Sequence, residues 1–201
     1  MSWITTIPYK EAKGTLLKLY NRIKGPNDHI DHILTIHSLR PHSLQGHMTL
    51  YKNVLHHKGN SLEKWYLEAL GIFVSKLNEC EYCYTHHSVG LRKLLEGNDR
   101  VDKIIDALLG DDLMEVFTAR ELEGFKYANK ITFDLNKVES SDIEALRYMG
   151  YTDGEILEIN QVVSYFNYVN RTVVGLGVDL EKDHFGLSPN DNDDPNNWGH
   201  G

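Results

Sequence analysis

The sequence predicts an all-α protein, and three observations support this prediction. Ser or Thr followed three residues later by Glu, the capping-box pattern that begins many helices, occurs three times ahead of apolar-periodic segments. Apolar residues recur at the helical spacing of about 3.6 residues over long stretches. Alternating apolar and polar runs joined by Asn-Gly or Asp-Gly turns, which are typical of β-hairpins, are missing. The capping boxes are Thr118/Glu121, Ser141/Glu144 and Thr152/Glu155.

The helices expected from this periodicity run from one end of the chain to the other. Two similar helix-start patterns have Asn in place of Ser or Thr: Asn60 with Glu63, and Asn78 with Glu81. Gly175 and Gly177 mark the end of the last helix. The expected helical segments are 9–23, 42–57, 62–77, 79–96, 100–109 and 119–131, followed by one helix after Ser141 and one after Thr152.

Length and composition indicate one folded domain and exclude several classes of function. The 201 residues are enough for one domain, which we expect to cover 1–183, with a polar and flexible tail over 184–201. The net charge of -8 argues against a nucleic-acid partner. The apolar stretches are too short to span a membrane, and the N-terminus lacks a signal-peptide pattern. We therefore expect a cytoplasmic protein with no bound cofactor.

The chain contains two cysteines, Cys80 and Cys83, separated by two residues. A disulfide across so short a loop removes little entropy from the unfolded chain, so a structural bridge is a poor explanation for the pair. Redox chemistry and metal binding are the alternatives. If Asn78 caps a helix that begins at Glu79, the positive end of that helix favours a Cys80 thiolate. Glu79 and Glu81 oppose a further negative charge, so the sequence leaves the thiol pKa open.

Two further residues have the right spacing to move protons. Cys83 and His87 are four residues apart and can touch on one helical face, so the imidazole can accept the thiol proton. His86 is the alternative, and helical geometry favours His87. Glu68 lies at the margin of the apolar stripe of the preceding helix, where apolar neighbours would raise its pKa and suit it to proton transfer. A solvated helix carboxylate is the other interpretation of Glu68.

Eleven residues separate Glu68 from the Cys80-x-x-Cys83 motif, and three residues separate that motif from His87. This spacing resembles the active-site signature of the alkylhydroperoxidase D/carboxymuconolactone decarboxylase-like superfamily. The segments 65–87 and 165–178 are similar to the peroxidase-related branch of that superfamily, and the resemblance covers most of residues 1–180. Tyr82 is a departure, because the best-studied family pattern has a histidine between the cysteines.

The resemblance implies an all-helical subunit that forms a homo-oligomer, commonly a trimer or hexamer, and reduces peroxides. Cys83 would attack the peroxide and become a sulfenic acid, and Cys80 would resolve it as a disulfide. Glu68 and His87 would form the proton relay. The implied partners are a peroxide substrate and an unidentified dithiol or protein reductant. Members that decarboxylate lactones lack the cysteine pair, which argues against that activity here.

Two other functions use the same cysteines. A zinc site could combine Cys80, Cys83 and His87, although a second ligand pair at similar spacing is missing from the sequence. A redox sensor would be oxidised once without turnover. The remaining motifs favour structural roles: His56-His57 for a helix C-terminus, Tyr165, Phe166 and Tyr168 for packing, and Arg171 for a salt bridge.

Overall fold

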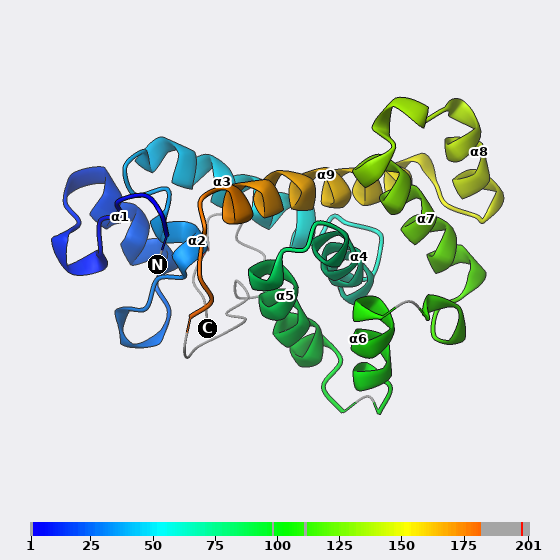
Figure 1. Ribbon diagram of the computed structural model, residues 1–201, viewed down its shortest axis with the longest axis horizontal. Coiled ribbons are helices and arrows are strands. Elements are labelled where there is room, and N and C mark those ends of the chain that lie inside the picture. Colours follow the sequence, from blue (N-terminus) through cyan, green and yellow to red (C-terminus); the bar gives the residue numbers. More distant parts are fainter. Residues whose placement is uncertain (1, 98, 111, 182–197, 199–201) are drawn as a thin grey trace.

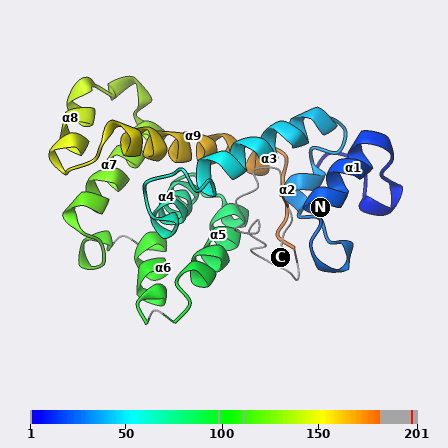
Figure 2. The same cartoon turned by 180° about the vertical axis from the view of Figure 1, so that it is seen from behind.

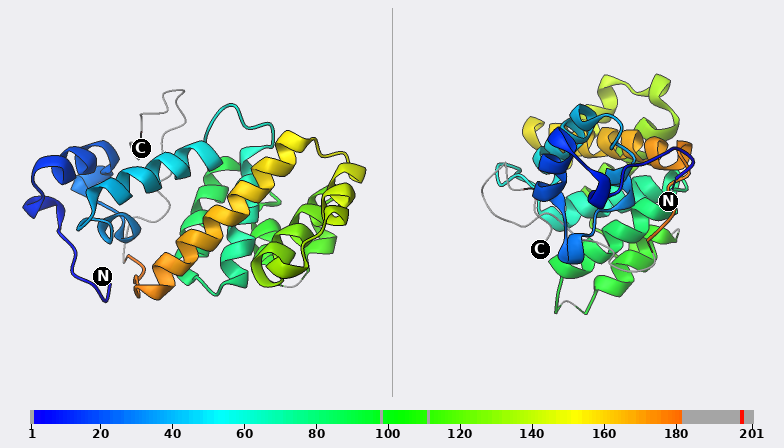
Figure 3. Two further views of the ribbon diagram at one scale, coloured as in Figure 1. Left: turned by 90° about the horizontal axis from the view of Figure 1, so that it is seen from above. Right: turned by 90° about the vertical axis from the view of Figure 1, so that its left-hand side faces the viewer.

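Helix α9 (Asp153–Gly175) is the longest of the described helices, and α3, α4, α5, α7 and α8 pack against it (Figure 1; Figure 2). This computed structural model describes residues 2–97, 99–110, 112–181 and 198. Helices α7 and α8 lie at one end of α9, α1 to α3 lie at the other, and α4 to α6 lie along one side (Figure 3). The described residues contain helices and no strand, which confirms the all-α prediction.

The predicted helical segments are present with shifted ends. The helices are α1 (Gly14–Ile23), α2 (His32–Thr35), α3 (Pro41–Leu55), α4 (Lys64–Leu77), α5 (Glu81–Leu94), α6 (Val101–Leu109), α7 (Ala119–Phe133), α8 (Ser140–Tyr148) and α9. Short 3-10 turns occur at Tyr9–Glu11, Pro26–Asp28, Leu113–Glu115 and Leu135–Lys137. None of the described helices is both long enough and apolar enough to cross a membrane.

Two of the three predicted capping boxes form as expected. Thr118 and Thr152 each accept a hydrogen bond from the backbone N–H of the Glu three residues on, and that Glu accepts one in return. The third prediction was wrong by two residues, because α8 is capped by Glu139 paired with Asp142. A carboxylate accepts backbone hydrogen bonds as a hydroxyl does, so an acidic pair can replace the Ser/Glu pattern.

The connection between α4 and α5 differs from the prediction, and it positions the cysteines. Asn78 ends α4 instead of capping α5, and Glu79 adopts a left-handed backbone with φ of 54°. The N–H of Cys80 donates to the carbonyl of Ser75 (2.8 Å) and the N–H of Glu79 to that of Lys76 (3.0 Å). This is a Schellman ending. As a result Cys80 itself is the N-cap of α5.

Helices α4 and α9 approach each other closely at Gly71. A Cβ atom at this position would lie 2.2 Å from the Phe166 ring, which is fully buried in α9. Only a residue without a side chain allows this contact. The main core surrounds α4 on this side and also includes residues of α5, α6 and α7.

A second, smaller core joins α1, α2 and α3. Trp198 belongs to this core and is buried, with the Arg22 guanidinium 3.7 Å from its ring centre. The predicted flexible tail over 184–201 lies outside the described residues apart from this tryptophan.

Candidate active site

The two cysteine side chains meet at the N-terminus of α5. Cys80 is the N-cap residue and Cys83 lies in the first turn, and their sulfur atoms are 2.7 Å apart. Both are free thiols with less than 5% of their surface exposed: 1% for Cys80 and 4% for Cys83. The separation is close to the roughly 2.05 Å of a disulfide, so oxidation of the pair requires little movement.

The pKa values of the two thiols are shifted in opposite directions. A hydrogen bond from the Cys83 thiol lowers the pKa of Cys80 against the opposing effect of burial, and the Cys83 backbone N–H and Asn170 also favour the Cys80 thiolate. Burial raises the pKa of Cys83 well above its usual range, and the hydrogen bond with Cys80 adds to this effect. Cys80, at the positive end of α5, is therefore the more acidic of the two thiols.

Asn170 of α9 holds the cysteine pair and the α4–α5 connection together. Its amide nitrogen donates to the Ser75 hydroxyl (3.0 Å), and its oxygen accepts from the Asn78 amide (3.0 Å). The same side chain hydrogen-bonds both thiols and favours their ionised forms. The sequence placed Asn170 in the family-like segment but assigned it no role.

The buried Glu68 of α4 and the partly exposed His87 of α5 form a hydrogen-bonded pair. Nδ1 of His87 lies 2.6 Å from a carboxylate oxygen of Glu68, whose side chain is 3% exposed. Because a carboxylate only accepts, Nδ1 carries the proton and Nε2 is left to accept one. The prediction that Glu68 lies at the margin of the apolar stripe of α4 was wrong, because its side chain is buried in the protein interior.

The expected direction of the Glu68 pKa was also wrong. Burial raises this pKa, but attraction to His87, the hydrogen bond with His87 and attraction to His56 together lower it below its usual value. His56 is the C-cap of α3, and its Nε2 lies 3.8 Å from the other Glu68 oxygen. Glu68 is therefore an ionised carboxylate flanked by two histidines.

Aromatic rings enclose these side chains. The Phe166 ring packs edge-on against His87 with centroids 4.7 Å apart, and Tyr51 packs edge-on against His56 at 4.8 Å. Burial raises the pKa of Tyr165 well above its usual range, and the nearby charges of Cys83 and Glu68 raise it further. Tyr165 therefore lies near both the thiol pair and the Glu68–His87 pair. The packing role predicted for Tyr165 and Phe166 agrees with their burial.

His86 points to a different carboxylate. Its Nε2 donates to Glu181 at 2.8 Å, and the Tyr82 hydroxyl donates to the same carboxylate at 2.8 Å. The Tyr82 and His86 rings stack at 4.3 Å. The hydrogen bonds thus separate the two neighbouring histidines, His87 toward Glu68 and His86 toward Glu181.

Two sequence-based alternatives find little support. Among the described residues, the His, Cys, Asp and Glu side chains grouped closely enough for a metal ion are His29, Asp31 and Glu181, and the cysteines are not among them. Within the described part of the chain, Arg171 donates to the carbonyl and side-chain oxygens of Asn167 and not to a carboxylate.

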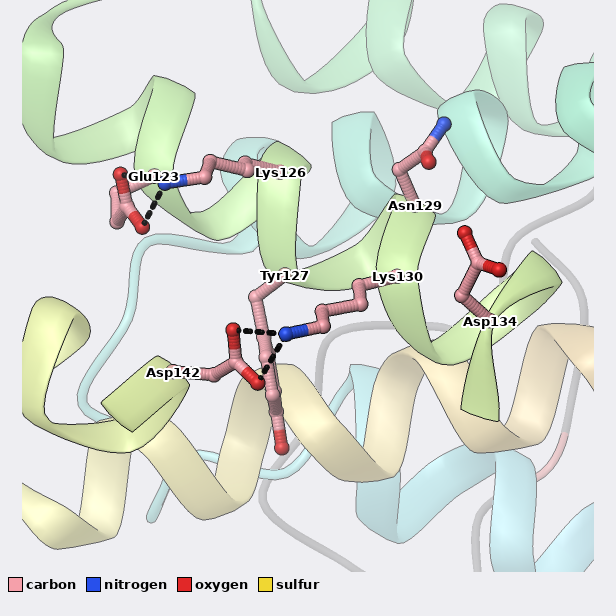
Figure 4. Close-up of a pocket in the computed structure, with 7 residues that line it drawn as sticks. All are labelled: Glu123, Lys126, Tyr127, Asn129, Lys130, Asp134 and Asp142. Atoms are coloured by element: carbon pink, nitrogen blue, oxygen red, sulfur yellow. Dashed lines mark hydrogen bonds and ion pairs between the residues drawn. The ribbon is translucent and has the colours of Figure 1, made fainter. Parts of the chain in front are cut away.

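A hollow of about 310 Å³ on α7 and α8 lies away from these groups (Figure 4). Its charged side chains are already paired, with Lys130 bound to Asp142 and Lys126 to Glu123. We assign no function to it.

No protein-family model matches the sequence, and no curated protein matches it. Three solved structures have similar folds. A peroxidase-related protein from Silicibacter sp. TM1040 has 23% identity and a TM-score of 0.67, over 75% of this chain and 76% of the other. An alkylhydroperoxidase AhpD core protein from Ralstonia eutropha JMP134, also peroxidase-related, has 19% identity and a TM-score of 0.72, over 90% and 93%. The debrominase Bmp8 has 14% identity and a TM-score of 0.65, over 84% and 87%.

These structures are all-helical like this chain, and one of them carries the alkylhydroperoxidase name. The match to the Ralstonia protein spans nearly the full length of both chains. The chain therefore has the fold of the alkylhydroperoxidase D-like superfamily, which its sequence resembles.

Proposed function

We propose that this protein is a thiol-dependent peroxidase that reduces hydrogen peroxide or an organic hydroperoxide. The observation that carries the proposal is a pair of free thiols 2.7 Å apart at the start of α5, the helix whose His87 is hydrogen-bonded to the buried Glu68 of α4. The similar folds of peroxidase-related proteins support it.

The first step in this proposal is attack by Cys83 on the peroxide. His87 Nε2 accepts the Cys83 thiol proton, and Glu68 stabilises the imidazolium that results. The Cys83 thiolate then attacks one peroxide oxygen, the O–O bond breaks, and the other oxygen leaves as water or alcohol with the proton from His87. Cys83 becomes a sulfenic acid.

The second step uses the lowered pKa of Cys80. Cys80 gives up its proton and attacks the Cys83 sulfur, the S–O bond breaks as the disulfide forms, and the hydroxide takes up that proton and leaves as water. A dithiol reductant then reduces the disulfide through a mixed-disulfide intermediate. Because the pKa of Cys80 is lowered, its thiolate forms more readily than that of an ordinary cysteine.

The test is a peroxide-consumption assay with a dithiol reductant, comparing the wild type with Cys83→Ser and Cys80→Ser. We expect Cys83→Ser to consume no peroxide. Cys80→Ser should stop after one oxidation and give a sulfenic acid on residue 83, which a dimedone probe and mass spectrometry detect. Labelling on Cys80 in the Cys83→Ser protein would exchange the two roles. A wild type that is oxidised once without turnover would be a redox sensor and not an enzyme.

The same thiol chemistry can reduce other electrophiles. One structure with this fold is a debrominase, and a variant of it has been crystallised with 2,3,4-tribromopyrrole. The assay therefore includes that compound as a second substrate. Release of bromide without peroxide turnover would replace the peroxidase proposal.

A further inference from the structure

A second cluster of ionisable side chains lies where the segment after α9 passes α2 (Figure 1). His29 and Asp31 come just before α2, and Glu181 comes after α9. One possible ligand atom from each of the three lies within 4.8 Å of the others, and Nε2 of His29 is 3.2 Å from Oδ1 of Asp31. Asp31 and Glu181 are buried, and His29 is partly exposed. Chain segments that are distant in sequence thus bring mixed nitrogen and oxygen donors together.

Neighbouring donors fix the orientation of the Glu181 carboxylate. It accepts hydrogen bonds from the His32 backbone N–H (2.6 Å), the Tyr82 hydroxyl (2.8 Å) and His86 Nε2 (2.8 Å). An ionised carboxylate has about four acceptor positions, so these three donors leave room for a cation. Carboxylates that bind metals are typically held by such outer hydrogen bonds.

A solvent path reaches the cluster. A hollow of about 680 Å³ is lined by His29 and His32 together with residues of the N-terminal segment, among them Thr6 and Tyr9. Its wall includes Asn27 and Asp28, whose φ values of 57° and 59° are unusual for residues other than glycine. Backbone in such conformations occurs often at binding sites. An ion in the hollow would meet the partly exposed His29 first.

We propose that His29, Asp31 and Glu181 bind a divalent transition-metal ion, and that Zn²⁺ fits them best. One imidazole and two carboxylates suit Zn²⁺, whereas Ca²⁺ and Mg²⁺ take oxygen ligands. Two ligands of a tetrahedral zinc ion are roughly 3.4 Å apart. The 3.2 Å between His29 and Asp31 matches this separation. The fourth position would be open to water from the hollow.

The site would link a bound metal ion to α5, the helix that begins at the cysteine pair, although neither cysteine is a ligand. Glu181 contacts Tyr82, which lies between Cys80 and Cys83, and His86 one turn further along α5. A bound ion would therefore fasten the segment after α9 to both α2 and α5. The expected consequence is a higher melting temperature in Zn²⁺, because a ligand of the native state stabilises it.

The test separates this site from the thiols. The full chain carrying Cys80→Ser and Cys83→Ser is stripped with a chelator and titrated with Zn²⁺ against a chromophoric competitor. We expect one equivalent to bind, and His29→Gln and Asp31→Asn to weaken binding at least tenfold in the same background. His42→Gln is the matched control, because this histidine is exposed on α3 and should leave the affinity unchanged.

Two readouts make the outcome decisive. In the wild type, Co²⁺ should give d–d absorption bands without a thiolate charge-transfer band. If the buried Asp31→Asn variant does not fold by circular dichroism, the partly exposed His29→Gln decides. Lack of stoichiometric binding in the double-serine protein would overturn the proposal, as would binding that His29→Gln leaves intact. Neither result bears on peroxide turnover, so this proposal and the peroxidase proposal can fail independently.

Discussion

Replacement of Glu68 by glutamine removes one charge from the proposed relay and keeps its shape. The carboxylate lies 2.6 Å from His87 and 3.8 Å from His56, and it is buried together with the His56 ring, whereas the His87 ring is partly exposed. Glutamine has the same volume and one oxygen that can still accept from His87 Nδ1. It cannot stabilise an imidazolium by charge. The substitution therefore tests the electrostatic role of Glu68 and not its packing.

The expected loss of peroxide turnover is large. General acid–base catalysis typically contributes about 10²–10⁴-fold, or roughly 3–5 kcal/mol of barrier. We expect at least a tenfold decrease, because glutamine retains the hydrogen bond that orients His87.

The expected loss of stability is smaller. Removal of one member of a buried ion pair can cost about 3–5 kcal/mol when the other charge remains. Here the imidazoles can release a proton and become neutral, so we expect about 1–3 kcal/mol. At about 2–4 °C per kcal/mol, the melting temperature should fall by about 2–12 °C.

The assay measures turnover and thermal melting on the same preparation, well below both melting temperatures. Glu158→Gln is the matched control. Glu158 accepts from the N–H groups of Ser61 (2.8 Å) and Leu62 (2.9 Å), so its replacement costs stability without touching the relay. Turnover of Glu68→Gln within threefold of the wild type would refute the reasoning. Equal losses in both variants would assign the effect to stability.

Four further predictions follow from the geometry. His87→Gln should lower turnover at least tenfold and His86→Gln much less, since His86 faces Glu181; the reverse order in a turnover assay would contradict the proposed relay. Gly71→Ala should lower the melting temperature measured by circular dichroism, because its methyl group would overlap the Phe166 ring; an unchanged value would mean that α4 and α9 separate easily. Because the pKa of Glu68 is lowered in the folded protein, the ionised carboxylate contributes its full stabilisation of the fold above the ordinary Glu pKa of about 4.3, and this contribution is lost as the pH falls toward the folded-state pKa. The melting temperature of the wild type should therefore fall more on acidification than that of Glu68→Gln. Light scattering after size exclusion should give a multiple of 23.1 kDa, and a monomer mass at micromolar concentration would contradict the homo-oligomer expected from the family resemblance.

The contacts that could be predicted from the sequence are those between side chains close to each other along the chain. Cys83 and His87 lie on one helix at a spacing of four, so a helical register was enough to place them on one face. Glu68 is predicted from its place beside the apolar stripe of the preceding helix, and the family-like spacing supports it. Its burial and low pKa depend on His56, which approaches from α3. A pair of residues from separate helices leaves no local pattern, so the sequence analysis predicts only a helix C-terminal role for His56.

The start of α5 was mispredicted for a local reason. Left-handed residues at helix ends are usually Gly or Asn, and here the position is occupied by Glu79. Without glycine as a stop signal, Asn78 resembled the cap of the next helix. The error matters for the chemistry, because the true N-cap is Cys80. The backbone N–H of Cys83, three residues on, helps to lower the pKa of the Cys80 thiol at this position.

The departure of Tyr82 from the family pattern has a structural explanation. A histidine between the cysteines could carry protons, whereas burial raises the pKa of Tyr82 well above its usual range and the nearby charge of Glu181 adds to this effect. A phenol that stays protonated cannot accept a further proton, and the Tyr82 hydroxyl donates its hydrogen to Glu181 while its oxygen accepts from the N–H of Ile33 (3.2 Å). It therefore anchors the first turn of α5 and takes no part in proton transfer. With His86 also directed to Glu181, proton movement in the proposed reaction falls to Glu68 and His87, with His56 on the far side of the carboxylate.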